Sequence, residues 1–488
     1  MELLSPAGNV EKLAYAYAYG ADAAYIGLKR FSLRVKADNF YDDEYKRVAE
    51  LKAKYPGRRL HCALNISFHD KEIDALKQNL DYFKQYPIDA FIVQDIGVVP
   101  LLQKEFPGVE LHLSTQASCV NSEAVKMYGK LGFKRIVLGR EISLDEIRRI
   151  KDANPDMELE AFCHGAMCIA YAGRCLMSAY LTGRSAQSGF CSHSCRWEYD
   201  VGTKISAEDA KKIAESGDLI LQERQRPGEY FPVFEGDDFT AILSSKDLRM
   251  IEHLADMKAA GVDSVKIEGR MKSVYYVAMV TRAYRKALDV LDGKLSAEDA
   301  APFIEELENV SHRESTTGFY YHKSDADKTT IGASDSKYQL AAEMGDEFVG
   351  AAFDGLYEEG QKRYNSWVKE MDEMHPAARA ARLKDLEIHT DRRIRAFEKK
   401  EGWRLYDCKA MNMIKSTDDI EFVSPTFCSL TAKPGEWEIV NTETGLLMDW
   451  TCDGHPCAIY TKYELPESTL LRTIDPDYVD GKIRDTGR

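Results

Sequence analysis

The stretch "DSVKIEGR" at residues 263–270 is an apolar strand pattern that ends in charged side chains, and the segment "YYVAMVTRAYRKALDVL" (275–291) follows it. Apolar residues in the second segment recur at three-to-four spacing, which is typical of an amphipathic helix. Working back along the chain, we find seven earlier strand patterns, at 1–7, 23–28, 60–66, 89–95, 109–116, 133–140 and 157–165. Segment 263–270 is therefore the eighth strand.

Helical patterns separate most of these strands, for example at 9–20, 71–86 and 143–154. Near-continuous apolar strands that alternate with helices indicate a parallel sheet covered by helices. A doubly wound open sheet would give the same alternation, but eight strand–helix units favour a closed barrel. We therefore predict an α/β fold, a TIM-like (β/α)8 barrel.

Polar residues stand at or near the ends of most of the predicted strands. In barrel enzymes these carboxyl ends build the active site, although any strand that leaves a core also meets polar residues. The positions singled out here are Asn65, Gln116, Arg140, His164, Glu268 and Arg270.

Composition places the chain among ordinary globular proteins, with 488 residues, 44% of them hydrophobic, and a net charge of −15. The start "MELLSPAGNV" does not resemble a signal peptide, and no apolar run reaches the roughly 20 residues that span a bilayer. We expect a cytoplasmic protein without a membrane partner. The net charge argues against indiscriminate nucleic-acid binding but leaves room for a local basic groove.

Three parts are expected along the chain. Residues 1–335 form the barrel, with a cysteine-rich insertion at 163–262 in which 228–254 is predicted as a hairpin followed by a helix capped at Ser244 or Ser245. Residues 336–401 form a linker and a charged helical insertion, read as two helices broken near Pro376. Residues 402–488 show short alternating segments and turns, which predict a small β domain.

Five of the eleven cysteines lie between Cys163 and Cys195, with the spacing C-x4-C-x6-C-x15-C-x3-C. In a reducing cytosol, clustered thiols more often bind metals or act in catalysis than form disulfides. Structural zinc sites favour paired C-x2-4-C knuckles, a form that only the last pair has. The C-x3-C-x2-C motif of radical-SAM proteins is absent. Spacing alone leaves an iron–sulfur cluster, zinc and redox or unligated thiols open.

We take four of these cysteines as ligands and Cys163 as a small core residue, because Cys163 belongs to the seventh strand and free cysteine packs as a hydrophobe. The other four lie in the loop that follows the strand. The predicted ligands are Cys168, Cys175, Cys191 and Cys195.

Several blocks of this sequence resemble the U32 family, long catalogued as collagenase-like peptidases. They include "ELLSPAGN", "LHLSTQASCVN", "GAMCIAYAGRCLMS", "KIEGRMKS" and "SHRESTTGFY", and together they span roughly residues 1 to 335. The block "CSHSCRWEY" and the added β domain resemble most the branch that hydroxylates tRNA. That branch makes 5-hydroxyuridine at the wobble position, depends on prephenate and is thought to carry an iron–sulfur cluster.

The resemblance implies RNA or ring hydroxylation without O2, with a cluster, expected to be [4Fe-4S], on the four loop cysteines. Its implied partners are tRNA, an electron donor and a paralogous U32 chain, and its implied hydroxyl donor is prephenate. Related branches hydroxylate 23S rRNA cytidine or act in ubiquinone hydroxylation. In relatives a strand like "FVGAAF" (348–353) leads directly into the β domain, whereas here the charged segment 354–401 intervenes. Its cluster "DRRIRAFEKK" (391–400) could grip RNA phosphates or form a solvated face balanced by acids.

The two carboxylates of prephenate would call for guanidinium partners. Arg140 and Arg270 are preferred because each ends a strand, and ion pairs with Glu141 or Glu268 are the alternative role. His164 is a candidate proton carrier or RNA contact, with a hydrogen-bonded core histidine as the alternative. Tyr171 and Trp197 could stack a base or shield the cluster. The full set of substrate-binding candidates is Arg34, Asn65, Gln116, Arg140, Arg174 and Arg270, and the catalytic candidates are His164 and Glu268.

Two other classes of function stay open. A peptidase needs a hydrolytic constellation, but neither H-E-x-x-H nor G-x-S-x-G occurs. Cys163 and His164 are adjacent strand residues that point to opposite faces, which makes a poor dyad. A non-catalytic RNA-binding or cluster-carrying scaffold would share every cysteine with an enzyme, so only turnover separates the two.

Overall fold

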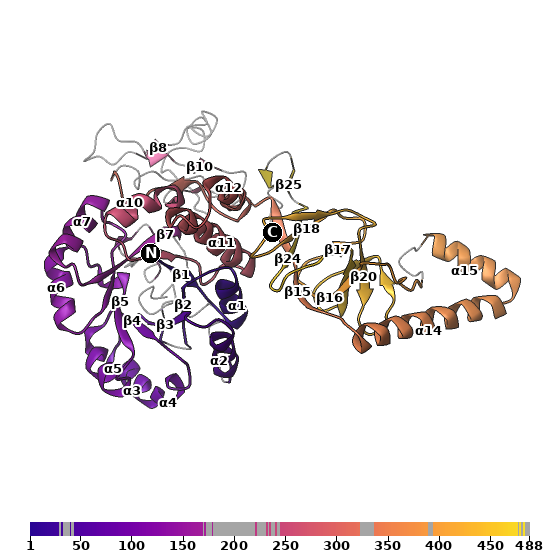
Figure 1. The fold of residues 1–488 in the computed structure, drawn as a ribbon, viewed down its shortest axis with the longest axis horizontal. Helices are drawn as coiled ribbons and strands as arrows, with labels where there is room; N and C mark the ends of the chain where they lie inside the picture. Colours follow the sequence, from indigo (N-terminus) through magenta and orange to yellow (C-terminus); the bar gives the residue numbers. More distant parts are fainter. Residues whose placement is uncertain are drawn as a thin grey trace, which may run out of the picture. The chain divides into compact units, whose positions relative to one another are not determined.

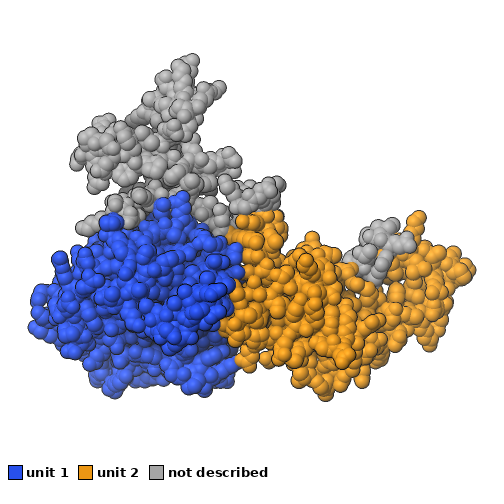
Figure 2. All heavy atoms as spheres, turned by 45° about the horizontal axis from the view of Figure 1, so that its top comes forward, with its two compact units in different colours: residues 1–335 blue, residues 336–488 orange. Residues whose placement is uncertain are grey.

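The computed structural model describes two compact units, residues 1–335 (the barrel unit) and 336–488 (the β unit) (Figures 1 and 2). Within them the described residues are 1–28, 31–32, 40, 43–168, 170–171, 178, 245–322, 336–388 and 394–476. The backbone is also described at 220–221, 231–232, 234–235, 240–241, 478–479 and 482–483.

Eight parallel strands close into a barrel, which confirms the predicted fold class (Figure 1). Neighbouring strands pair in sequence order from β1 to β7, and β13 closes the ring by pairing with both β7 and β1. The strands are β1 (Glu2–Pro6), β2 (Ala23–Ile26), β3 (Arg59–Leu64), β4 (Ala90–Val93), β5 (Glu110–Leu113), β6 (Arg135–Val137), β7 (Glu158–Ala166) and β13 (Ser264–Ile267).

Helices surround the barrel, and polar caps fix where several of them begin. Asn9, Asn121, Ser143 and Ser273 each accept a hydrogen bond from a backbone N–H of the first helical turn. The predicted helix 71–86 is divided at Asn79 into two helices. The described α-helices of the barrel unit are α1 (Val10–Ala18), α2 (Tyr45–Lys54), α3 (Asp70–Gln78), α4 (Leu80–Phe83), α5 (Val99–Glu105), α6 (Ser122–Lys130), α7 (Leu144–Ala153), α10 (Leu254–Ala259), α11 (Val274–Leu291) and α12 (Ala297–Glu305).

Strand β7 continues beyond the barrel and joins a short side sheet. Its last residues pair antiparallel with β12 (Asp247–Arg249), which pairs in turn with β14 (Ser315–Thr316). The helix predicted after Ser245 is therefore wrong, because this segment is strand β12 and the next α-helix begins only at Leu254. The serines resemble a helix cap locally, but the buried side chain of Leu248 packs as part of a sheet.

The β unit is built around an eight-stranded sheet with the order β19-β18-β24-β15-β16-β23-β20-β21. Strand β15 (Tyr338–Glu347) lies in the middle of this sheet, so the β domain begins earlier in the chain than residue 402. The remaining strands of the sheet are β16 (Arg404–Ala410), β18 (Ile420–Val423), β19 (Leu430–Ala432), β20 (Trp437–Asn441), β21 (Leu447–Met448), β23 (Cys457–Thr461) and β24 (Leu470–Ile474).

Two helices, α14 (Ala351–Glu373) and α15 (Pro376–Ile388), are inserted between β15 and β16 (Figure 1). The first turns of α14 pack Phe353 and Tyr357 on the ring of Phe397. One turn further, a Cβ atom on Gly360 would lie 2.1 Å from the carbonyl oxygen of Gly445, so only glycine permits this approach. The segment 348–353 thus turns into a helix instead of continuing as a strand.

None of the helices in the described ranges combines the length and the apolarity that crossing a membrane requires.

Candidate functional site

Backbone contacts draw together the carboxyl ends of β1, β7 and β13, where the polar strand-end residues lie. A Cβ atom on Gly8, just after β1, would lie 2.1 Å from the carbonyl oxygen of Arg270, just after β13. Gly165 in β7 has a φ of +105°, and its Cβ would lie 2.6 Å from the carbonyl oxygen of Glu268. Larger residues would separate the strand ends, so these two glycines set a narrow spacing on this side of the barrel mouth.

A bulge redirects β7 as it leaves the barrel. The register between β7 and β13 shifts by one residue at Cys163. The hydroxyl of Tyr284 donates to the Cys163 carbonyl at 2.7 Å, and the hydroxyl of Tyr320 donates to the Phe162 carbonyl at 2.6 Å. Bulges often re-aim side chains next to active sites, and this bulge lies five residues before Cys168 in the chain.

The structure separates Cys163 from Cys168. Cys163 is fully buried, its thiol donates to the Lys266 carbonyl at 3.4 Å, and burial raises its pKa well above the usual range. It is a core residue, as expected. Cys168, two residues beyond the end of β7, is exposed. The other predicted ligands, Cys175, Cys191 and Cys195, lie outside the described residues.

Arg140 follows β6, and its guanidinium contacts three different groups. Its Nη1 donates to the Ala166 carbonyl at 2.7 Å, and its Nη2 donates to a carboxylate oxygen of Glu268 at 3.0 Å. The guanidinium also lies 3.7 Å above the ring centroid of Phe162. The ion pair considered as the alternative role of Arg140 is present, and it engages Glu268, the candidate catalytic carboxylate.

The other described substrate-binding candidates lie at strand ends, as predicted. Arg270 is 3% exposed and contacts the Ser32 hydroxyl through Nη2. Gln116 lies in a 3-10 turn (Thr115–Ala117) after β5 and is buried, whereas Asn65 follows β3 and is half-buried. Arg34 and Arg174 lie outside the described residues.

His164 is enclosed by tyrosines. Its Nδ1 lies 3.3 Å from the Tyr284 hydroxyl, and its ring lies 6.0 Å from that of Tyr276. Burial lowers the pKa of His164 to about 3, so the ring is neutral at physiological pH. This environment corresponds to a hydrogen-bonded core histidine.

A charged layer fills part of the barrel interior, and the sequence analysis missed it. The buried carboxylate of Glu160 accepts hydrogen bonds from Lys266 Nζ at 2.8 Å and from Arg135 Nη1 at 3.2 Å. Beside it, the rings of His61 and His112 lie 4.8 Å apart. The signal was the alternation of charged or histidine residues with apolar ones inside the strands, as in "ELEAFC".

The same layer has the residue types of a metal site, since ligand atoms of His61, His112 and Glu160 all lie within 4.8 Å of one another. Burial lowers the pKa of both histidines, so they are neutral. However, the Glu160 carboxylate already contacts Lys266 and Arg135, and like charges repel a third cation strongly in a buried site. We therefore interpret the layer as a structural ion network.

The described basic side chains of the segment 391–400 are paired within the β unit. Arg395 contacts the carboxylate of Asp449, Lys399 Nζ lies 2.7 Å from Asp354, and Lys400 Nζ lies 2.7 Å from Glu438. These contacts correspond to a solvated face balanced by acids.

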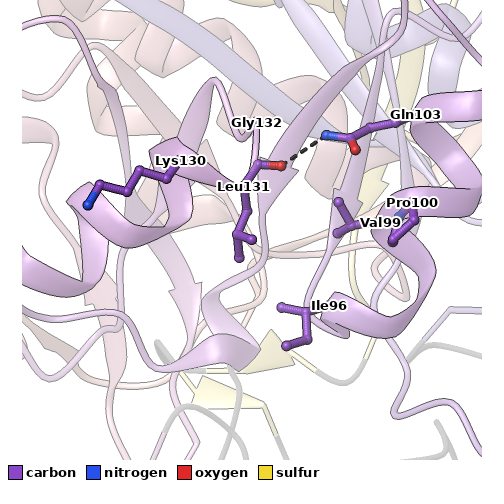
Figure 3. A pocket seen from close by; sticks show the side chains of 7 residues that line it. All are labelled: Ile96, Val99, Pro100, Gln103, Lys130, Leu131 and Gly132. Atoms are coloured by element: carbon purple, nitrogen blue, oxygen red, sulfur yellow. Dashed lines mark hydrogen bonds between the residues drawn. The ribbon is translucent and has the colours of Figure 1, made fainter.

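A shallow hollow of about 380 Å³ lies on the outer helices of the barrel unit (Figure 3). Ile96, Val99, Pro100 and Leu131 line it, and Gln103 Nε2 donates to the Leu131 carbonyl at 2.9 Å. Its lining includes none of the predicted site residues.

The comparisons with known proteins decide the family. The family model described as peptidase family U32 matches residues 8–330. The chain belongs to the U32 family. A solved U32 structure, that of the U32 peptidase Mk0906, covers 55% of this chain and 92% of its own with 13% identity and a TM-score of 0.32.

Relatives within the family carry different names. The tRNA hydroxylation protein P of Escherichia coli is 40% identical over 65% of this chain and 74% of its own length. The 23S rRNA 5-hydroxycytidine C2501 synthase of Escherichia coli is 35% identical over 73% of this chain and 50% of its own length. A collagenase of Porphyromonas gingivalis is 29% identical over 65% of this chain and 73% of its own length.

Proposed function

We propose that this U32 chain hydroxylates RNA without O2 and that its product is 5-hydroxyuridine at the wobble position of tRNA. The observation that carries the proposal is its 40% identity over 337 residues to the tRNA hydroxylation protein P of Escherichia coli. Similarly named proteins of Haemophilus influenzae and Bacillus subtilis are each 38% identical.

The proposal includes a [4Fe-4S] cluster on Cys168, Cys175, Cys191 and Cys195. One described feature fits this donor set, because Cys168 is an exposed residue beyond the end of β7, whereas Cys163 is buried in the core. When bound, such a cluster supplies electrons one at a time. A separate electron donor would then be needed to reduce it.

Exchange of a hydroxyl group for hydrogen between a donor carbon and uracil C5 is balanced in electrons. The base is oxidised by two electrons and the donor is reduced by two, so no external oxidant is consumed. Prephenate, the proposed donor, carries two carboxylates that guanidinium groups bind as forks. We assign this contact to Arg270 together with Arg34 and Arg174, and we assign base contacts to Asn65 and Gln116.

Aromatic and acid–base roles follow from exposure. Tyr171 is 52% exposed and follows Cys168 closely, so its ring is available to stack on an extruded base. Trp197, the second aromatic candidate, lies outside the described residues. The neutral, enclosed ring of His164 suits a positioning role better than proton transfer to RNA. Glu268 keeps its place as the candidate catalytic carboxylate.

The rRNA reading is the second candidate function, and the identity to the 23S rRNA 5-hydroxycytidine synthase favours it. The peptidase reading has less support in the described residues. A nucleophilic cysteine needs an accessible thiolate, whereas Cys163 is fully buried with a raised pKa and its neighbour His164 contacts Tyr284 instead.

Expression in a bacterium that lacks its own tRNA and rRNA hydroxylation proteins tests the proposal. Nucleosides from purified tRNA and 23S rRNA are compared by mass spectrometry. We expect 5-hydroxyuridine to return in tRNA, and Cys168→Ala to abolish it. Hydroxycytidine in rRNA alone would favour the second candidate, and no hydroxylated nucleoside in either RNA would contradict the proposal.

A further inference from the structure

We propose that Arg140 is a positioning residue that fixes the chain leading to Cys168, and that it is not an arginine that binds the hydroxyl donor. This inference rests on the proposed function, in which Cys168 is a cluster ligand. It concerns the two residues between the bulge of β7 and that cysteine, Ala166 and Met167.

The two carbonyl groups immediately before Cys168 each accept a side-chain hydrogen bond. Arg140 Nη1 donates to the Ala166 carbonyl at 2.7 Å, and the Ser245 hydroxyl donates to the Met167 carbonyl at 2.9 Å. The pairing of β7 with β12 reaches only as far as Ala166 and Asp247. At the end of this pairing, hydrogen bonds from the side chains of Arg140 and Ser245 satisfy the backbone carbonyl groups, as hydrogen bonds between strands do within a sheet.

Arg140 is itself fixed by groups on two other strands. Its Nη2 lies 3.0 Å from the Glu268 carboxylate, which follows β13, and its guanidinium lies 3.7 Å above the ring centroid of Phe162 in β7. The side chains of Arg140 and Glu268 are 14% and 17% exposed. A planar guanidinium can make the two hydrogen bonds and the stacking contact together, whereas a lysine ammonium cannot.

In this arrangement both terminal nitrogens of the Arg140 guanidinium are engaged by protein groups. Bidentate binding of a donor carboxylate uses two parallel N–H groups, and here each terminal nitrogen already directs one of its N–H groups to a protein oxygen, that of the Ala166 carbonyl or of the Glu268 carboxylate. A donor carboxylate at Arg140 would therefore compete with Glu268 for the guanidinium and disturb the geometry that holds the Ala166 carbonyl. The geometry is that of a clamp on the ligand-bearing segment.

Amide hydrogen exchange of the peptide 164–171 in the full-length chain tests the clamp directly. Because Arg140→Met removes a hydrogen bond from a charged donor to the Ala166 carbonyl, we expect exchange to rise about tenfold or more in this variant. Ser245→Ala loses a neutral hydrogen bond and should show a smaller rise, about fivefold. Arg148→Met is the matched control, since Arg148 is 51% exposed and pairs with Asp145 on α7.

A second readout connects the clamp to the cluster. In anaerobically purified protein we expect Arg140→Met to shift the electron paramagnetic resonance spectrum and midpoint potential of the reduced cluster, with Arg140→Lys restoring them only in part. Unchanged exchange in Arg140→Met would overturn the inference. So would Arg140→Lys raising KM for prephenate with exchange and spectrum unaltered. A wild-type protein without iron would instead refute the cluster, while the exchange result would still decide the clamp.

Discussion

At the scale of single residues, the unusual feature of this barrel is a network of charged side chains in its interior. Glu160 is fully buried and contacts both Lys266 and Arg135. These two cations lower the pKa of the Glu160 carboxyl against the opposing effect of burial. Removal of the Glu160 charge leaves the buried Lys266 ammonium without its carboxylate, which costs far more than loss of a surface pair.

We expect Glu160→Gln to lower the free energy of unfolding by about 3–5 kcal/mol at pH 7, because Lys266 would stay buried without its anion, whereas Arg135 keeps Glu2 and Glu158 as partners. Urea unfolding followed by circular dichroism measures this change. Glu123→Gln is the control, since Glu123 is 79% exposed and pairs with Lys126 on the same helix, and its effect should stay within about 0.5 kcal/mol. Equal effects of the two variants would contradict the structural role of the network.

The buried, neutral state of His164 leads to a second prediction, which concerns the pH dependence of the free energy of unfolding. Its folded pKa of about 3 lies below the unfolded value, so the unfolded chain binds more protons between these two values. The contribution of His164 to the free energy of unfolding is therefore fully present above a pH of about 6.5. It falls as the pH is lowered, by up to about 1.4 kcal/mol per pH unit for each such histidine. We expect His164→Phe to lower the slope of unfolding free energy between pH 5 and 6.5 relative to the wild type. Identical slopes in His164→Phe and wild type would refute the neutral, buried state.

At the scale of secondary-structure elements, glycine contacts decide where pieces of the chain dock. Gly360 on α14 meets the Gly445 loop at a distance that no Cβ tolerates, whereas a Cβ on Gly355 of the same helix would meet nothing within 4 Å. A substitution at Gly355 therefore reports helix propensity alone, whereas one at Gly360 also reports the packing of α14 against the Gly445 loop.

We expect Gly355→Ala to stabilise the β unit by about 0.5–1 kcal/mol, because alanine loses less backbone entropy in a helix. Gly360→Ala should instead destabilise it by about 1–3 kcal/mol through overpacking. Denaturant unfolding gives both values, and hydrogen exchange at residues 441–447 reports whether α14 has left the loop. Stabilisation by both variants would show that the helix does not depend on this contact.

The sequence predicted correctly the strands that carry an apolar run of their own. It did not predict strands that form only because they pair with distant parts of the chain. The eight barrel strands carry apolar runs that identify them one by one. Strand β12 lacks such a run, and the serines before it resemble a helix cap, yet pairing with β7 makes it a strand. Likewise β15 became part of the sheet only through its partners β16 and β24, which follow it by dozens of residues.

At the scale of the whole molecule, the barrel places the described strand-end candidates where the sequence predicted them, but the sequence could not predict their contacts. The strand-end positions of Asn65, Gln116, Arg140, Glu268 and Arg270 followed from the count of strands. Their partners did not, because contacts such as those of Arg140 with Ala166 and Glu268 join residues far apart in the chain. The clustering of cysteines was visible in the sequence, and so was the difference between Cys163 in a strand and Cys168 in the following loop, which the structure shows as buried and exposed residues.

The central claim is that this chain itself hydroxylates RNA, and turnover by the purified protein tests it most directly. The protein is purified without O2, reduced, and incubated with prephenate and tRNA that lacks hydroxyuridine, and the nucleosides are then analysed by mass spectrometry. We predict more than one 5-hydroxyuridine formed per protein chain, dependent on prephenate and lost in Cys168→Ala. A protein that carries iron and sulfide and binds tRNA but forms no hydroxyuridine with any of these additions would contradict the account and show a scaffold.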